Sequence, residues 1–304
     1  MQSPYSVPLS KDRRRFTKKL SELPADQSPA ITKSAFRNAF VRNPYSRMFS
    51  AYVDKAYAPN PFYWDQWGKK AIRLFRKKTE RQSARCGHNA TFAEVMSYAN
   101  KILYKSDIHF LPISKLCRPC QYQYHFIGKM ETFSEDVVFL AQSLNLTIVS
   151  YLESQQFKFD YAKDAIEDSI SSPFLWKKKI LRCMSWYEAG LRIWRKLQIR
   201  GIISRRISFP YSAESFEVAT SKEFITAAVD AYRRSTDRAE LKQQKKDAFL
   251  EAYSTLNVIA LQKLMTTMQS DFELFDYDEH AADVFDIGGD ITRGAFDWFY
   301  EWRK

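Results

Sequence analysis

A short apolar stretch that leads straight into a helical pattern constrains the fold of this chain most. Residues 36–41 are apolar and aromatic, and they end at Arg42-Asn43-Pro44. Pro44 suits the first turn of a helix, because the N–H group that proline lacks would have no partner there. The sequence therefore predicts a strand, a tight turn and a helix. The helix is marked by apolar side chains at helical spacing, namely Met48, Phe49, Tyr52 and Val53.

A strand that feeds a helix start is also a candidate anion site. The first N–H groups of the helix have no partner, and the helix dipole is positive at that end, so the turn suits a phosphate. Arg42 can place its forked guanidinium on phosphate oxygens. Ser50, two turns into the helix, can contribute its hydroxyl only to a phosphate that lies along the helix side. The alternative is that Arg42 and Arg47 are surface charges beside an ordinary helix.

Composition narrows the partner class without selecting one partner. The chain has 304 residues, a net charge of +12 and only 8 glycines. This charge favours an anionic partner such as a nucleic acid, a polyanionic sugar, a phosphorylated nucleotide or a membrane face. The sequence has no glycine-rich dinucleotide or Walker motif, and no zinc-finger, RNP or helix-turn-helix pattern, so nucleic acid is not expected. It has no apolar run of about 18 residues that would span a membrane.

The chain is expected to have three parts. Residues 1–32 are polar and basic and are expected to form a loose arm, residues 33–277 form the domain, and residues 278–304 are a C-terminal tail. Within the domain, Thr91 and Glu94 predict a capping box at the start of a helix. Further elements are expected as a strand at 124–128, a helix capped by Ser134, and a helix at 239–268.

Three blocks of sequence resemble the Golgi carbohydrate sulfotransferases of the chondroitin 4-sulfotransferase and HNK-1 sulfotransferase type. The first is similar to that family's 3′-phosphate-binding motif, and its matching residues are Arg42, Pro44, Arg47, Ser50, Ala51, Tyr52, Asp54 and Lys55. The second contains Asp107-Ile108-His109-Phe110, Cys117-Arg118-Pro119-Cys120 and the stretch 124–132. The third is Asp271-Phe272-Glu273-Leu274-Phe275-Asp276-Tyr277.

The resemblance implies an α/β, P-loop-like sulfotransferase fold with a helix-rich periphery. It implies that the donor is PAPS (3′-phosphoadenosine 5′-phosphosulfate), that the acceptor is an acidic or neutral glycan, and that no metal takes part. The location implied is the lumenal side of the Golgi membrane. Arg42 and Ser50 would then bind the 3′-phosphate of the donor, with Arg47 as an additional candidate.

Sulfuryl transfer needs a base that takes the proton of the acceptor hydroxyl. His109 is the candidate, since it is the one histidine of the second block's Asp107–Phe110 run. The alternative is a histidine that is exposed or hydrogen-bonded for structural reasons. Lys129 and Glu131 match a strand of the family, and they can equally form an ion pair at the edge of the core.

The chain departs from the family in two places. Residues 1–35 contain no 5′-phosphosulfate loop, and no membrane anchor is found, so we expect an incomplete product that lacks the N-terminal part of the sheet. Membrane attachment is then expected only through an anchor absent from this chain. The alternative is a catalytically inactive relative that binds nucleotide and glycan. The second departure is residues 150–235, a basic, Trp-rich insertion that can bind an acidic glycan or simply fold poorly.

The cysteines and two asparagines complete the candidate sites. Cys117 and Cys120 cannot form a structural zinc site alone, because such a site needs four ligands, and Cys86, Cys183 and scattered histidines lie at irregular spacing. In a lumenal family a structural disulfide is expected, with Cys117 and Cys120 as candidates, although the pairing stays open. Asn89 and Asn145 begin glycosylation acceptor sequences.

Overall fold

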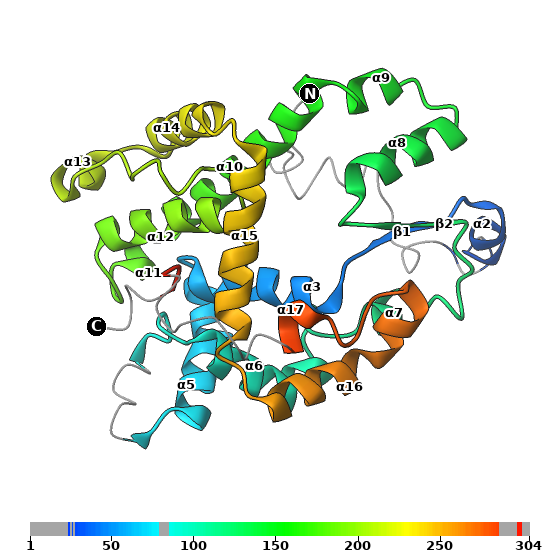
Figure 1. The fold of residues 1–304 in the computed structure, drawn as a ribbon, viewed down its shortest axis with the longest axis horizontal. Coiled ribbons are helices and arrows are strands. Elements are labelled where there is room, and N and C mark those ends of the chain that lie inside the picture. Colours follow the sequence, from blue (N-terminus) through cyan, green and yellow to red (C-terminus); the bar gives the residue numbers. More distant parts are fainter. Residues whose placement is uncertain (1–23, 25, 27, 79–84, 286–296, 300–304) are drawn as a thin grey trace. The chain divides into compact units, whose positions relative to one another are not determined.

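Helices make up most of the computed structural model, which describes residues 24, 26, 28–78, 85–285 and 297–299 (Figure 1). The described residues contain one small parallel sheet. The chain forms two units, one from Met1–Val41 with Cys117–Asp168 and the other from Arg42–Leu116 with Ser169–Lys304. Among the described residues, no helix is both long and apolar enough to cross a membrane.

The first unit contains the sheet. Strand β1 (Asn38–Val41) pairs in parallel with β2 (Phe126–Lys129), with Asn38 opposite Phe126 and Val41 opposite Lys129. Both strands were predicted at these places. Gly128 allows the strands to approach, because a Cβ there would lie 2.5 Å from the Phe40 ring. The other elements are α2 (Ser28–Ser34), α8 (Phe133–Ser143), α9 (Val149–Leu152) and the first part of α10 (Gln155–Leu175).

Two predictions in this unit need correction. Helix α8 begins at Phe133, with Thr132 at the N-cap position, so Ser134 is not the cap. The Asp136 carboxylate instead organises this start, because it accepts hydrogen bonds from the Lys129 N–H (2.6 Å) and the Thr132 hydroxyl (2.8 Å). Most of the arm predicted for residues 1–32 lies outside the described residues, and its end is helical in α2 rather than loose.

The second unit is built from helices. They are α3 (Pro44–Ala51), η2 (Tyr52–Tyr57), α4 (Pro61–Tyr63), η3 (Trp64–Gly68), α5 (Lys69–Phe75), α6 (Phe92–Lys101), η5 (Leu103–Lys105), α11 (Lys177–Ile180), α12 (Trp186–Ile199), α13 (Ala213–Val218), α14 (Ser221–Arg234), α15 (Arg238–Tyr253), α16 (Val258–Phe275) and α17 (Ala282–Phe285). Helix α7 (Ile113–Cys117) ends where the chain returns to the first unit. Here η2 and η3 are π-helical segments, which occur frequently at functional sites.

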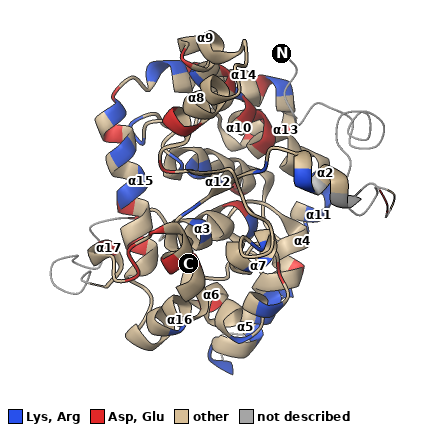
Figure 2. Ribbon diagram, turned by 90° about the vertical axis from the view of Figure 1, so that its right-hand side faces the viewer, with Lys and Arg blue, Asp and Glu red and all other residues tan. Residues whose placement is uncertain are grey.

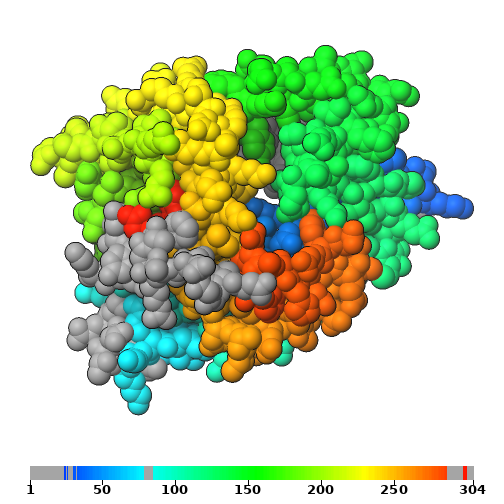
Figure 3. All heavy atoms as spheres, viewed as in Figure 1, coloured from blue at the N-terminus to red at the C-terminus, as the bar shows by residue number. Residues whose placement is uncertain are grey.

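Helix α3 lies at the centre of this unit's core, as the predicted strand, turn and helix require. The Asn43 side chain caps it by accepting a hydrogen bond from the Ser46 N–H (3.2 Å), and Pro44 occupies the first turn. The Tyr45 ring packs against Tyr253 and Phe272. Helices α15 and α16 both pack against α3, and little of the blue surface beside α15 is visible in the space-filling view (Figure 3).

The predicted helix at 239–268 is two helices. Helix α15 ends at Tyr253 and α16 begins at Val258, where the Asn257 side chain caps it. The sequence block at 271–277 closes α16, and its first residue has a structural role. The buried Asp271 carboxylate accepts hydrogen bonds from the N–H groups of Ile113 (2.6 Å) and Ser114 (2.8 Å), so it caps α7.

The Trp-rich stretch at 150–235 folds well, which corrects the expectation of a poorly folded insertion. Its indoles at Trp186 and Trp194 are only 1% and 3% exposed. They stack in an aromatic cluster with Phe216 and Phe224. Two of the interleaved cations, Arg192 and Lys196, are buried too. These two rings pack in the core and cannot stack on a sugar, whereas Trp176 is half-buried, so glycan binding by this stretch stays a prediction.

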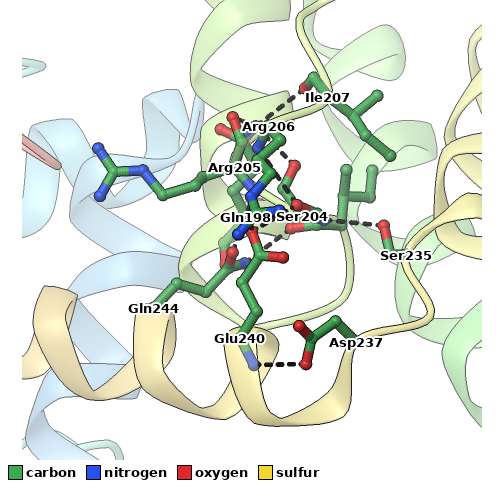
Figure 4. A network of polar contacts seen from close by, with 10 residues as sticks. Gln198, Ser204, Arg205, Arg206, Ile207, Ser235, Asp237, Glu240 and Gln244 are labelled. Atoms are coloured by element: carbon green, nitrogen blue, oxygen red, sulfur yellow. Dashed lines mark hydrogen bonds and ion pairs between the residues drawn. The ribbon is translucent and has the colours of Figure 1, made fainter.

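A network of polar contacts holds the turn after α12 against α15 (Figure 4). The buried Gln244 amide donates hydrogen bonds to the carbonyl groups of Gln198 and Ile203, both at 2.7 Å. The Ser204 N–H donates to the Ser235 hydroxyl (2.8 Å), and the Ser204 hydroxyl donates to Glu240 (2.9 Å). The buried polar groups that these bonds join are therefore satisfied within the protein.

The described part of the predicted tail, 278–304, is docked. Glu251 of α15 accepts hydrogen bonds from the N–H groups of Trp298 (2.8 Å) and Phe299 (3.1 Å). The Trp298 ring is 1% exposed and lies beneath the guanidinium groups of Arg195 and Arg205.

Candidate functional site

The turn between β1 and α3 presents the predicted donor-binding residues. Arg42 follows β1 directly, and Ser50 lies one residue before the end of α3; both are half-buried. The Asn43 side chain already satisfies one N–H group of the helix start, that of Ser46. Binding of a phosphate by Arg42 and Ser50 stays a prediction.

Arg47, the additional donor-binding candidate, makes a structural contact. Its guanidinium donates a hydrogen bond to the carbonyl oxygen of Leu111. This contact ties α3 to the segment that follows His109. It gives Arg47 a positioning role within the second unit, whether or not it also meets a donor.

His109 lies at a pocket of about 450 Å³. The pocket is formed within the second unit, by α4, η3, α5, α6, η5 and the loop around residue 107. Aromatic rings and a few polar groups line it, among them Phe62, Tyr63, Gln66, Trp67, Lys70 and His109. A concave, aromatic surface with few polar groups is typical of a small-molecule site.

A chain of hydrogen bonds orients the His109 ring. Its Nδ1 lies 2.8 Å from Oδ1 of Asp107, and its Nε2 lies 3.3 Å from the hydroxyl of Tyr63. Because a carboxylate only accepts hydrogen bonds, Nδ1 carries the proton and Nε2 is left as the acceptor. The other Asp107 oxygen accepts a hydrogen bond from the Trp67 indole N–H (2.9 Å). Burial raises the pKa of Tyr63 above its ordinary value of 10.0, so its hydroxyl stays protonated at neutral pH.

A group of charges also lies near Tyr63. The Lys55 ammonium lies 5.5 Å from the centre of the Tyr63 ring and 2.7 Å from the Asp54 carboxylate. Asp54 also binds the buried Lys196 at 2.5 Å. Burial alone would raise the pKa of the Asp54 carboxyl, but Lys196 and Lys55 hold it well below its ordinary value. Asp54 is therefore ionised and holds Lys55 beside the pocket.

His109, the candidate base, lies at this pocket, and its catalytic role stays a prediction; the sequence analysis did not identify the residues around it. Asp107 belongs to the same block, and the Asp-x-His spacing is a local signal for their hydrogen bond. Tyr63 and Lys70 carry no such signal, because tertiary packing, and not their spacing in the sequence, brings them to the pocket. Lys129 ends β2, with Glu131 two residues on, and any function of either stays a prediction.

The disulfide differs from the candidate pair. Cys86 and Cys183 are bonded, whereas Cys117 and Cys120 are free thiols, so a disulfide between the latter two is not formed. The reason is tertiary: the bonded cysteines lie 97 residues apart, and only the packing of the second unit brings them together.

The two candidate glycosylation sites differ in access. Asn145 is exposed, in a left-handed turn after α8 (φ 51°). Asn89 is half-buried, its side-chain oxygen is buried, and its carbonyl group accepts a hydrogen bond from Arg76 (2.9 Å). Asn145 is therefore the more accessible of the two side chains, and glycosylation of either stays a prediction.

Comparison with known proteins adds independent information. A family model described as "Sulfotransferase family" matches residues 4–172, a range that reaches beyond the predicted domain start and into the Trp-rich stretch. Carbohydrate sulfotransferase 8 of Mus musculus is 33% identical over 108 residues, which are 35% of this chain and 26% of that protein. Carbohydrate sulfotransferase 9 of Homo sapiens is 36% identical over 107 residues (34% and 24%). Carbohydrate sulfotransferase 14 of Danio rerio is 29% identical over 137 residues (45% and 37%).

The chain thus spans roughly a quarter to a third of the length of these curated relatives. No solved structure matches it significantly. The matched residues 4–172 are more than half of the 304 in the chain, and they contain Arg42, Ser50 and the His109 pocket loop. The chain belongs to the sulfotransferase family.

Proposed function

We propose that this chain carries the catalytic part of a carbohydrate sulfotransferase, which moves a sulfuryl group from PAPS to a hydroxyl of a glycan. One observation supports this most: His109 is oriented by Asp107 and Tyr63 at an open pocket of about 450 Å³. The matched relatives are named carbohydrate sulfotransferases, which favours a glycan acceptor. The parallel β1–β2 pair followed by α3 fits a P-loop-like sheet.

The donor is proposed to bind at the turn between β1 and α3. A dianionic 3′-phosphate needs a fixed guanidinium and neutral donors, which Arg42 and the Ser50 hydroxyl supply. Requiring that phosphate excludes nucleotides that lack it. No metal is needed in this arrangement.

The chemistry is proposed to begin with the acceptor hydroxyl at His109. As the hydroxyl oxygen forms its bond to sulfur, its proton passes to Nε2 of His109. The bond between sulfur and the bridging oxygen breaks, and its electron pair leaves with 3′,5′-ADP. The Asp107 carboxylate stabilises the imidazolium that forms, as in other carboxylate–histidine pairs.

The pocket also suggests how the acceptor is held. The rings of Phe62, Tyr63 and Trp67 offer apolar faces for a sugar ring. Lys70 lines the same pocket, and its ammonium favours a sugar that carries an anionic group. The names of the matched relatives support a location on the lumenal side of the Golgi membrane, a setting in which a disulfide persists.

The test has a binding arm and an activity arm. Arg42→Ala should weaken 3′,5′-ADP binding about 10–100-fold, as expected for loss of a charge-assisted hydrogen bond. Arg73→Ala, an exposed cation on α5, is the matched control. His109→Gln should lower the rate of labelled sulfate transfer about 10²–10⁴-fold while nucleotide binding is unchanged.

The outcomes separate the proposal from its alternative. One outcome is that nucleotide binding is lost in Arg42→Ala, while the wild-type chain joined to a 5′-phosphosulfate loop transfers sulfate to no glycan. That outcome would identify an inactive nucleotide-binding relative. Equal binding by Arg42→Ala and wild type would refute the donor site.

A further inference from the structure

A second cluster of reactive side chains lies apart from the His109 pocket. Cys86, His88 and Cys183 place two sulfurs and a ring nitrogen within 4.8 Å of one another, and each residue is half-buried. The two sulfurs are joined as a disulfide. The Nδ1 atom of His88 is buried and has no hydrogen-bond partner among the described residues.

The local backbone is held by contacts that do not involve the disulfide. The His88 carbonyl group accepts a hydrogen bond from the buried Arg192 (2.6 Å). The Asn89 carbonyl group accepts one from Arg76 (2.9 Å), which is itself paired with Glu94. Gly87 packs so closely on Gly68 that a Cβ on Gly68 would lie 2.1 Å from the Gly87 carbonyl oxygen. The histidine side of the cluster is therefore preorganised.

The cysteine at 183 is held in the same way. Its N–H donates a hydrogen bond to the Ile180 carbonyl group (2.8 Å), and a capping box at Ser185 starts α12 two residues later. Opening the sulfur–sulfur bond therefore leaves both thiols beside the His88 ring.

We propose that in the reduced protein Cys86, His88 and Cys183 form a zinc site with a water molecule as fourth ligand. Two thiolates and an imidazole are ligands that zinc prefers. With Zn–S bonds of about 2.3 Å and Zn–N bonds of about 2.0–2.1 Å, tetrahedral ligand atoms lie roughly 3.5 Å apart. The three ligand atoms already lie within 4.8 Å of one another, so small movements reach this spacing once the two sulfurs separate.

The step is a reduction followed by metal binding. A phosphine reductant and one water convert the disulfide into two thiols, and the phosphine becomes its oxide. Zn²⁺ then forms two Zn–S bonds as the two thiol protons leave to solvent. The same three residues thus connect distant parts of the second unit by a disulfide when oxidised and by a metal when reduced.

Cobalt titration tests the site directly. The full chain with Cys117→Ser and Cys120→Ser is reduced with a phosphine and titrated with Co²⁺, which is then displaced by Zn²⁺. We expect one Co²⁺ per chain, with a thiolate-to-cobalt charge-transfer band that the oxidised protein does not show. His88→Ala should weaken metal binding at least about 10–100-fold, as outer-shell losses alone do. His280→Ala, an exposed histidine, should not change it.

A stability measurement covers the case in which reduction unfolds the chain. Zn²⁺ should raise the unfolding temperature of the reduced protein, or restore its helical circular dichroism signal, and should not affect the oxidised protein. The proposal is wrong if the reduced protein shows neither a cobalt band nor zinc stabilisation. It is equally wrong if His88→Ala binds Co²⁺ as tightly as its parent.

Discussion

Two histidines of the second unit show how the surroundings of a residue set its chemistry. His109 lies at an open pocket, where Asp107 accepts a hydrogen bond from one ring nitrogen and the other faces the Tyr63 hydroxyl. His88 instead lies between the Trp64 ring and the cationic Arg192. A carboxylate supports the protonated imidazole, while burial beside a cation opposes it. The same side chain is therefore hydrogen-bonded to a carboxylate in one place and kept neutral by burial beside a cation in the other.

His88 should make stability depend on pH. Its pKa is lowered from 6.5 to about 4 in the folded chain, so between these values the unfolded chain binds a proton that the folded chain does not. Stability should be constant above pH 6.5 and fall as the pH drops toward 4, by about 2 kcal/mol after discounting partial exposure. Urea unfolding at pH 7 and pH 5 measures it. His88→Gln should reduce the pH dependence of the free energy of unfolding, and His280→Gln should not change it. An unchanged pH dependence in His88→Gln would contradict the assignment to His88.

At the scale of elements, α5 and the π-helical η3 before it have side chains in two environments, some that line the pocket and others that form ion pairs outside it. Gln66 and Lys70 line the pocket one helical turn apart, whereas Lys69 forms an ion pair with Asp65 (2.6 Å). Figure 2 shows the basic residues gathered along α5. Among the described residues, Lys70 has the Gln66 amide oxygen at 3.5 Å and no carboxylate as a partner. Of these two neighbouring lysines on one helix, Lys69 is thus paired with a carboxylate, whereas Lys70 contacts an uncharged amide.

This difference provides a matched pair of variants. Lys70→Gln should raise the KM for an acceptor with a uronic acid about 2–5-fold, the size of one exposed ion pair, and leave the KM for a neutral acceptor unchanged. Lys69→Gln should change neither, because its charge is already matched by Asp65. Initial rates with the two acceptors measure the effect. Equal changes in both variants would mean that net charge, and not the pocket, attracts the acceptor.

At the scale of the whole molecule, long-range contacts hold the second unit together from two separate stretches of chain. The Tyr253 hydroxyl donates to the Tyr45 carbonyl group (2.8 Å), and Asp271 caps α7. The disulfide from Cys86 to Cys183 closes a loop of 97 residues. A crosslink that closes so long a loop restricts the unfolded chain strongly.

Removing the disulfide should therefore be costly. Cys86→Ser with Cys183→Ser should lower the free energy of unfolding by about 2–5 kcal/mol. Thermal unfolding should show this as a fall of about 5–15 °C in Tm. The matched control is Cys117→Ser with Cys120→Ser, which removes two free thiols and should leave Tm unchanged. Similar falls in both double variants would indicate that the loss is not due to the crosslink.

Spacing in the sequence is enough to predict an interaction when the interacting residues are only a few positions apart. The β1–α3 turn with Pro44, the capping box at Thr91 and the Asp107–His109 pair all join residues a few positions apart, so the sequence by itself determined them. The family also follows from such blocks. The break between α15 and α16 is local too, but Asn257 was overlooked as a cap within an apolar pattern.

Only the tertiary structure decided which distant residues meet. Tyr63 reaches His109 across 46 positions, and Cys86 bonds to Cys183 across 97. The burial of Trp186 and Trp194 likewise depends on α13 and α14 packing around them. These contacts result from burying apolar surface between elements, which is non-directional and leaves no fixed spacing in the sequence. The sequence could therefore supply candidate residues and local turns, whereas the pocket, the charges around it and the crosslink depend on the tertiary structure.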